Sequence, residues 1–372
     1  MRRRTRGFTL MEIMIAMALT AIVTASVLAI VRTQLQTFEM QDQLVRTQQN
    51  TRAGMDFVET IVRRACGGIS SGWLYVYTPG LVSTTGNFPC LRVYDGAKVN
   101  GNTFTTTTPA SLPDALEVVY ATGTMTALTK HTNLYTNSPQ IDVLDTCGFS
   151  AGDYLLLTDA SYGNAALFHV SAVPAAASCP NAGTLSLDTV STAPSTSAMP
   201  TVSDYVLNTS IGTPVFKAAT YSLYVSTDSN YNGMLMVDPD GVASTSHTNY
   251  VKVQPAIEGV VDFQIAVGND LDASGTITDS PDEWIGNVSG ETIPTPSAVS
   301  PWNSSNTATM PQLRQVRVSL LLQTLNQYAG TPGTITPFED RTVYPSTPSA
   351  NAAPRYRSVR MVVAPRAWNL TE

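Results

Sequence analysis

The chain has 372 residues, enough for one large domain or two ordinary ones, with a formal net charge of −7 and only 13% charged residues. The many Thr, Ser, Gly, Pro, Asn and Tyr residues are typical of a β-rich protein that works outside the cytoplasm. The acidic balance excludes the basic surface with which proteins bind nucleic acid, because the positive charges cluster only at Arg2, Arg3, Arg4 and Arg6.

The first predicted element is an apolar helix. From Phe8 to Val31 the only ionisable side chain is Glu12, and this run is long enough to cross a hydrocarbon core of about 30 Å. The arginines before it place the N-terminus in the cytoplasm and the bulk of the chain outside. A secretory signal has a shorter apolar region, of roughly 7–15 residues, and a small-residue cleavage site. We therefore expect a membrane anchor.

The helix is expected to continue beyond the apolar run, because the first proline of the chain is Pro79. Arg63 and Arg64 followed by Gly67 form a typical helix end. An apolar stripe marks one face of the second half: Leu35, Phe38, Val45, Met55, Val58 and Val62. The pattern predicts a helix from about Thr9 to Ala65, with residues 8–31 as a transmembrane and assembly helix and residues 32–66 as its amphipathic continuation.

The leader "MRRRTRG" followed by "FTLMEIMIAMALTAIV" resembles the class III prepilin signal of type IV pilins and type II secretion pseudopilins. In that family a prepilin peptidase in the membrane cuts after the glycine, and the new N-terminal residue is methylated. The resemblance implies that residues 1–7 are a leader and that cleavage falls between Gly7 and Phe8. Phe8 would then be methylated, and Glu12 would be the fifth mature residue.

Glu12 is expensive in a membrane, at roughly 2.5–3.5 kcal/mol on insertion scales, so it needs a partner. In an assembled filament the available partner is the amine of Phe8 on a neighbouring subunit. Such a pair would fix the axial register between helices, because a shifted neighbour leaves a buried charge unpaired. The alternative is that Glu12 reaches the cytoplasmic interface, which suits an unassembled monomer.

Four cysteines, Cys66, Cys90, Cys147 and Cys179, contain no CxxC pair and suit two disulfides in an oxidising compartment. Three connectivities are open, and the sequential pairing closes the shortest loops. Buried free thiols are the alternative. A zinc site is disfavoured by the wide spacings and because His131, His169 and His247 lie near no cysteine pair.

From about Ser70 onward, short apolar runs alternate with Thr/Ser/Pro/Gly loops, which predicts strands. The runs are "LEVVYAT", "DYLLLTD", "ALFHVSAV", "TYSLYVST", "GMLMVD", "VVDFQIAVG", "RQVRVSLLLQT" and "RSVRMVVAP". We expect an α+β, pilin-like fold in which the long helix packs on antiparallel sheet. A β-rich region with a large insertion spans residues 67–254, and a C-terminal sheet region spans residues 255–372.

Two C-terminal patterns, "QLRQVRVSLLLQT" and "RYRSVRMVVAPRAWN", resemble the arginine-flanked and last strands of PilW-like minor pilins and of J-type pseudopilins. "QQNTRAGMDFVETIVRRACGGI" resembles the end of the PilW-like helix. The length of the chain favours PilW, since J-type pseudopilins are generally shorter. The resemblance does not cover the middle of the chain.

Catalytic motifs are weak. Gly148, Ser150 and Gly152 have the spacing of a hydrolase nucleophile elbow, which requires a helix after the serine. Here a strand-like run follows, so a tight turn is the better interpretation. No phosphate loop, dinucleotide fingerprint or HExxH motif occurs. We expect no enzymatic activity.

The segment "NDLDASGTITDSPDEW" resembles the opening of an EF-hand loop and is a candidate calcium site. The glycine at loop position 6 suits a sharp turn, but position 12 is Pro281, so another carboxylate, Asp282 among the candidates, must close the site. A solvated acidic turn is the alternative. The candidate ligands are Asp270, Asp272, Ser274, Thr276, Asp279 and Glu283.

Together these features favour a minor pilin that primes or caps a type IV pilus. The resemblance implies a tip position with other minor pilins and a PilY-type adhesin, and contacts to major pilins through the N-terminal helix. The protein would be a single-pass inner-membrane protein with a periplasmic head before assembly, and part of a cell-surface pilus afterwards. The alternatives are a J-like tip pseudopilin of a type II secretion system and a single-span periplasmic enzyme or sensor.

Overall fold

The computed structural model divides the chain into two compact units, Met1–Gln49 and Asn50–Glu372, which we describe separately. The residues that it describes are 9–68, 73–76, 86–100, 103–106, 112–131, 140–158, 165–174, 178–188, 213–226, 233–239, 253–270, 274, 276–278, 283–287, 313–323, 339 and 356–365.

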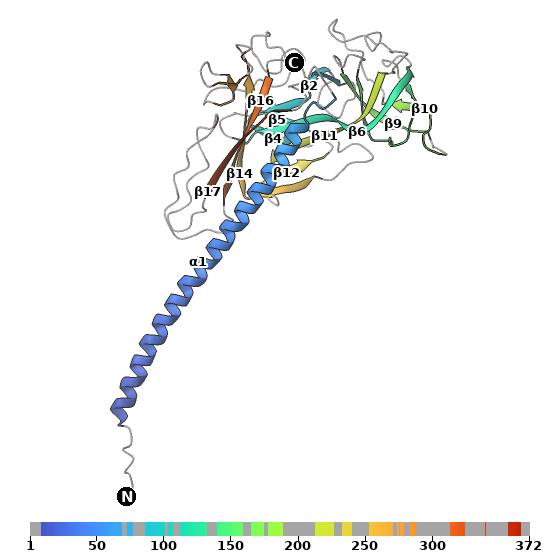
Figure 1. Cartoon of the computed structure of the whole chain (residues 1–372). Helices are drawn as coiled ribbons and strands as arrows, with labels where there is room; N and C mark the ends of the chain where they lie inside the picture. Colours follow the sequence, from blue (N-terminus) through green and yellow to red (C-terminus); the bar gives the residue numbers. More distant parts are fainter. Residues whose placement is uncertain are drawn as a thin grey trace. The chain divides into compact units, whose positions relative to one another are not determined.

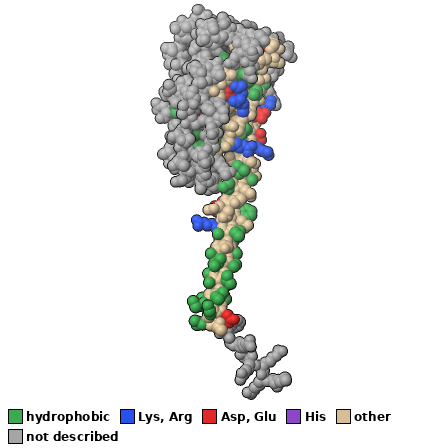
Figure 2. Space-filling model, turned by 90° about the vertical axis from the view of Figure 1, so that its left-hand side faces the viewer, with side chains coloured by type: hydrophobic (Ala, Val, Ile, Leu, Met, Phe, Trp, Pro, Cys, Tyr) green, Lys and Arg blue, Asp and Glu red, His purple; other side chains and the backbone are tan. Residues whose placement is uncertain are grey.

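A single helix, α1 (Leu10–Arg64), begins in the first unit and ends in the second (Figure 1). Its bounds confirm the predicted helix from about Thr9 to Ala65. In the first unit nearly all of its large apolar side chains are exposed, and Figure 2 shows apolar side chains around the N-terminal part of the helix. Leu35, Phe38 and Val45, the first half of the expected apolar stripe, are among these exposed side chains.

The last turns of α1 are the only part of the described helix that is buried. The buried positions are Thr51, Gly54, Met55, Val58, Ile61 and Val62. They include the second half of the expected stripe and place it in the main hydrophobic core. Gly54 has a specific role here, because any side chain at this position would collide with Ile257 of the sheet. Glycine therefore lets the helix backbone and the strand approach closely.

The helix ends where it joins the sheet. Cys66 has φ 62° and Gly68 has φ 82°, left-handed conformations that close a helix at its C-terminus. The Cys66 amide donates to the Val119 carbonyl at 3.0 Å, and the Ala121 amide donates to the Gly67 carbonyl at 2.7 Å. A disulfide joins Cys66 to Cys90, so the end of α1 is held by both covalent and hydrogen bonds.

The second unit contains 11-stranded, 4-stranded and 2-stranded sheets. All eight segments predicted to be strands are strands. The bounds are β1 (Trp73–Val76), β2 (Gly86–Pro89), β3 (Leu91–Tyr94), β4 (Ala97–Asn100), β5 (Thr103–Thr106), β6 (Ala115–His131), β7 (Gln140–Val143), β8 (Tyr154–Thr158), β9 (Ala165–Ala172), β10 (Gly183–Leu187), β11 (Thr213–Val225), β12 (Met234–Asp238), β13 (Gln254–Glu258), β14 (Val260–Asn269), β15 (Trp284–Ile285), β16 (Leu313–Gln323) and β17 (Tyr356–Val363).

Almost every described strand pair is antiparallel, as predicted for an α+β pilin-like fold; β1 and β9 pair in parallel. The largest sheet runs β13-β12-β11-β6-β7-β10-β9-β1-β2, with β3 beside β6 and β8 beside β11 and β9. The C-terminal sheet runs β15-β14-β16-β17, and β4 pairs with β5. Residues 255–372 therefore supply all of the C-terminal sheet, but β13 of that range belongs to the larger one.

Within the largest sheet, six strands form a closed ring that the sequence did not predict. The pairs β6–β7, β7–β10, β10–β9, β9–β8, β8–β11 and β11–β6 are all antiparallel and return to the starting strand. The ring encloses its own apolar cluster, which includes Leu128, Val143, Leu157, Phe168 and Val215. The expected insertion is thus a small β-barrel, in which ring closure leaves no free edge among these strands.

The two larger sheets share the main core and are joined at a polar seam. Asp114 is buried between them; its amide donates to the Phe263 carbonyl at 2.7 Å. Its carboxylate accepts the amides of Ile265 at 2.8 Å and of Gly96 at 3.0 Å. One carboxylate thereby binds both a strand of the C-terminal sheet and the turn between β3 and β4, and charge-assisted bonds of this kind are strong.

A second buried polar group lies within the largest sheet, on β3 and β6. Arg92 and Glu117 are opposite each other on β3 and β6, and their side chains pair at 3.0 Å with 1% and 3% exposed. The Tyr94 hydroxyl donates to Glu117 at 3.0 Å. Burial raises the pKa of Glu117, and the charge of Arg92 and the bond from Tyr94 partly offset this rise. Burial also raises the pKa of Tyr94.

We predict that Arg92→Met lowers the free energy of unfolding of the second unit by about 3–5 kcal/mol, because Glu117 is left buried without a counter-charge. Adding Glu117→Gln should recover most of this loss, since it removes the charge and keeps an acceptor for Tyr94. Urea unfolding measures both. Arg63→Met, which breaks an exposed ion pair with Glu59, is the control and should cost less than about 1 kcal/mol. Equal losses for Arg92→Met and the double variant would contradict the prediction.

Candidate assembly site on the N-terminal helix

The first part of α1 is long and apolar enough to cross a membrane, and all of its side chains in that stretch are exposed. Its hydroxyl groups bond to the backbone of their own helix. Thr20 donates to the Ala16 carbonyl at 2.7 Å, Thr24 to Thr20 at 2.8 Å, and Ser26 to Ile22 at 2.9 Å. These bonds let the helix enter hydrocarbon without an unsatisfied hydroxyl. Glu12 is the one described ionisable group in this stretch.

Glu12 is bonded to Thr9, the residue just before the helix. The Thr9 amide and the Thr9 hydroxyl both donate to Glu12 Oε2, at 2.9 and 3.0 Å. The Glu12 amide lies 3.3 Å from the Thr9 hydroxyl, which accepts from it. This is a capping box, in which a threonine at the N-cap and a glutamate three residues later satisfy each other's backbone amides. The sequence interpretation missed Thr9, although the T-x-x-E spacing signals it.

A shallow apolar groove runs along the same helix, starting at Glu12. Most of its lining is Ala, Thr, Ile, Met or Leu: Ile13, Ala16, Met17, Thr20, Ala21, Thr24, Ala25 and Leu28. Small residues on one face let another helix approach closely, which is how helices pack in membranes. Glu12 thus lies at one end of a surface suited to a second helix. The processing residues Gly7 and Phe8 lie outside the described residues.

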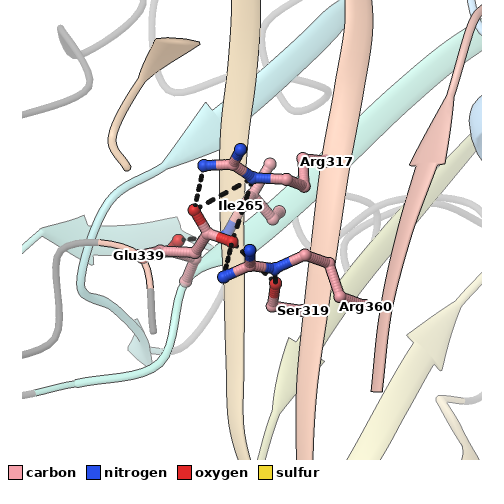
Figure 3. A network of polar contacts seen from close by, with 6 residues as sticks. Ile265, Arg317, Ser319, Glu339 and Arg360 are labelled. Carbon is pink, nitrogen blue, oxygen red and sulfur yellow. Dashed lines mark hydrogen bonds and ion pairs between the residues drawn. The ribbon is translucent and has the colours of Figure 1, made fainter. Parts of the chain in front are cut away.

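One arginine from each of the two C-terminal motifs contacts the same carboxylate, that of Glu339 (Figure 3). Glu339 has a fully buried side chain and accepts from Arg317 of β16, whose Nη2 lies 2.6 Å from Oε2. Ser319 donates to Oε1 at 2.8 Å, and Arg360 of β17 lies 3.1 Å from the same oxygen. The Arg317 guanidinium also stacks over Trp284 at 4.3 Å. These contacts link β15, β16 and β17, so their role is structural. No pattern in the sequence identified Glu339 as their common partner.

The cysteines form the sequential pairs. Besides Cys66–Cys90, a disulfide joins Cys147 to Cys179 beside the barrel. The Asp145 carboxylate accepts the amides of Asn181 and Cys147, and these bonds lower its pKa. The disulfide and these hydrogen bonds together hold residues 145–147 against residues 179–181.

The segment with the hydrolase-like spacing is a turn, as expected. Gly148 and Gly152 have φ 91° and 95°, and the Ser150 amide donates to Asp153 at 2.7 Å. Strand β8 follows, not the helix that a nucleophile elbow requires.

The described histidine side chain, His169, is 6% exposed; its Nδ1 lies 2.6 Å from Asp188. His247 lies outside the described residues, and only the backbone of His131 is described. In the described part of the chain, no group of three His, Cys, Asp or Glu residues could hold a metal ion.

The acidic loop after β14 is described in part. Asp270 is 1% exposed, accepts the Ser274 amide at 2.9 Å, and lies 3.4 Å from Arg314. Glu283 is also buried and accepts the Thr278 amide at 2.7 Å. The Ser274 hydroxyl lies 3.1 Å from that of Thr276.

Both Asp270 oxygens are thus engaged within the chain, and a calcium ion bound there would compete with the positive charge of Arg314. Asp272 and Asp279 lie outside the described residues.

Comparisons with known proteins agree with the N-terminal features. Residues 2–28 match the family model of the prokaryotic N-terminal methylation motif. No curated protein matches the chain. A type IV-like pilin from Thermus thermophilus is a matching solved structure, with 13% identity, coverage of 59% of this chain and 84% of that one, and a TM-score of 0.22. The matched motif covers the start of the chain, and in the structure a long apolar helix and antiparallel sheets follow it.

Calcium binding at the acidic loop stays a prediction, and calorimetry tests it. If the loop binds calcium, calcium added to the protein should release or absorb heat, and Asp270→Asn with Glu283→Gln should abolish that heat, because both carboxylates would be ligands. Asp56→Asn, an exposed acid on α1, is the control and should leave the heat unchanged. Absence of heat with the native protein would contradict the prediction and favour a turn held by Arg314.

Proposed function

We propose that this protein is a minor pilin, a structural subunit that primes or caps a type IV pilus. The observation that carries the proposal is the position of Glu12, a carboxylate within an exposed apolar helix. It is the one described ionisable side chain in the exposed apolar stretch of α1, whose hydroxyls bond to their own backbone, and it lies within the matched methylation motif. A charged carboxylate is costly in hydrocarbon, and a positive group on a neighbouring subunit would offset that cost.

Before assembly, the helix would anchor the protein in the inner membrane, with its N-terminus in the cytoplasm and the second unit in the periplasm. The length and apolar surface of α1 support this arrangement, and so do the arginines before it. Prepilin peptidase would remove residues 1–7, and Phe8 would be methylated.

During assembly, the helix would leave the bilayer and pack against the helices of other pilins. The groove of small residues that starts at Glu12 supports such packing. The Glu12 carboxylate would pair with the Phe8 amine of a neighbour and set the axial register. The same surface of α1 would contact both other minor pilins and major pilins.

A tip position is supported by the size of the second unit. Shaft subunits pack closely through their helices, and a unit that adds a six-stranded barrel to its main sheets would crowd its neighbours along a shaft. The resemblance of the C-terminal strands to PilW-like minor pilins supports the same position, beside a PilY-type adhesin.

The second candidate is a J-like tip pseudopilin of a type II secretion system, favoured by the same arginine-flanked strands, β16 and β17. It would use the same peptidase and the same helix. The neighbouring genes distinguish these two candidates, because pilus and secretion subunits lie in different gene clusters.

We predict that the mature protein begins at Phe8 and carries a methyl group on its amine. Mass spectrometry of the protein purified from its own membranes measures both features. Gly7→Leu should block the cleavage, because the family's peptidase requires the glycine. An intact "MRRRTRG" terminus on the native protein would refute the proposed function.

We predict that Glu12→Ala leaves insertion and cleavage intact and lowers incorporation into filaments on the order of tenfold. The physical reason is that a neighbour's amine left unpaired in an apolar environment costs about 1–3 kcal/mol. Immunoblots of sheared filaments and of the membrane fraction measure the effect. Glu39→Ala, an exposed acid further along α1, is the matched control. Normal incorporation of Glu12→Ala would show that the carboxylate is dispensable.

A further inference from the structure

We propose that the charged part of α1 binds a second copy of this chain, whose helix lies parallel to the first and is displaced by seven residues along the axis. The proposed function names other pilins as neighbours, so the inference goes beyond it by assigning a homotypic partner. It rests on the proposed function in one respect, because the shared membrane anchor is what makes the two helices parallel.

Charged side chains recur along α1 after its apolar stretch, and Figure 2 shows basic and acidic side chains along this part of the helix. Opposite charges stand seven residues apart at four places, and like charges stand seven residues apart nowhere in the helix. The pairs are Arg32 with Glu39, Glu39 with Arg46, Arg52 with Glu59, and Asp56 with Arg63. The first two pairs lie in the first unit and the other two in the second.

A spacing of seven residues has no use within a single helix. Residues seven apart are separated by about 10.5 Å along the axis, which is too far for an ion pair. The ion pairs that α1 forms within itself join residues four apart, Asp42 with Arg46 at 2.9 Å and Glu59 with Arg63 at 2.6 Å. Four side chains of the pattern take part in no ion pair with any residue that the structure describes: Arg32, Glu39, Arg52 and Asp56.

The same spacing selects a register between two parallel helices. Seven residues are close to two full turns, so displacements of zero, seven or fourteen residues keep the same side of each helix in contact. With no displacement every charge lies beside its own copy, and with fourteen residues Arg32 lies beside Arg46 and Asp42 beside Asp56. Only a displacement of seven residues places opposite charges together and no like charges, so the pattern disfavours the other two registers.

These ion pairs would contribute specificity more than affinity. One exposed pair changes an equilibrium constant by at most about fivefold. The affinity would come from the apolar groove on the same helix, whose small residues allow close packing. Removal of one charge leaves its partner in water and costs little, whereas reversal of a charge places like charges side by side. Charge reversal is therefore the sharper test.

Cysteine cross-linking of the full chain in its own membranes tests the register. Ala53 and Thr60 are exposed, uncharged and seven residues apart, and all four native cysteines are in disulfides. One tagged copy carries Ala53→Cys, and a second copy with a different tag carries Thr60→Cys. On oxidation, we expect the disulfide between these two copies to form about fivefold more than the disulfide between two Ala53→Cys copies. An equal or larger yield between two Ala53→Cys copies would overturn the displaced register.

Charge reversal in one copy and compensation in the other test the ion pairs themselves. Arg52→Glu in the Ala53→Cys copy should lower the mixed disulfide about fivefold, because two carboxylates then lie side by side. Glu59→Lys in the Thr60→Cys copy should restore the yield, because it returns an opposite charge to that position. An unchanged yield with Arg52→Glu, or no recovery with Glu59→Lys, would overturn the proposal.

The matched control is Asp42→Lys in the Ala53→Cys copy. This reversal breaks the ion pair with Arg46 within the helix, but the residue seven positions further on is the neutral Gln49, so the mixed disulfide should be unchanged. Mass spectrometry of the same samples reports whether the chain begins at Phe8. Cleavage at Phe8 without the mixed disulfide would refute the homotypic pairing and leave the proposed function intact, whereas the mixed disulfide on an uncleaved chain would do the reverse.

Discussion

The burial of one face of α1, from Thr51 to Val62, is the interaction on which the second unit depends. Met55, Val58, Ile61 and Val62 belong to one apolar cluster with side chains from both larger sheets. At roughly 25 cal/mol per Å² of apolar surface removed from water, this shared core is the main favourable term that joins the two sheets. The helix is thus a structural element of the head as well as an anchor.

Buried hydrogen bonds and ion pairs then fix the relative positions of the strands, which apolar burial alone does not determine. Hydrophobic contact has no preferred direction, whereas a buried carboxylate accepts hydrogen bonds only from donors in defined positions. Asp114 fixes the seam between the larger sheets in this way, and Glu339 brings β16 and β17 together through two arginines. At the start of α1, the Glu12 carboxylate accepts the Thr9 amide and hydroxyl and so caps the helix.

The barrel gives the insertion a physical explanation. A pair of extra strands at the edge of a sheet would present unpaired backbone groups to other chains, which invites aggregation. Here β6 and β11 are long enough to take part in both the main sheet and the ring, and β7, β8, β9 and β10 complete the ring around a separate apolar cluster. The protein can therefore carry a large addition to its head without a second free edge within that ring.

The sequence by itself determined the elements whose cause is local. An apolar run as long as residues 8–31 is typical of a membrane-spanning helix, a leader with glycine and phenylalanine carries its motif in consecutive residues, and short runs rich in Val and Leu between turns form strands. The sequence also favoured the sequential disulfides by loop length. Only the tertiary structure decided which part of the apolar stripe is buried, that six strands close into a barrel, and that Glu339 meets Arg317 and Arg360. Those features depend on contacts between residues far apart in the chain, and no local pattern encodes them; Thr9 and Glu12, three residues apart, could have been found from the sequence.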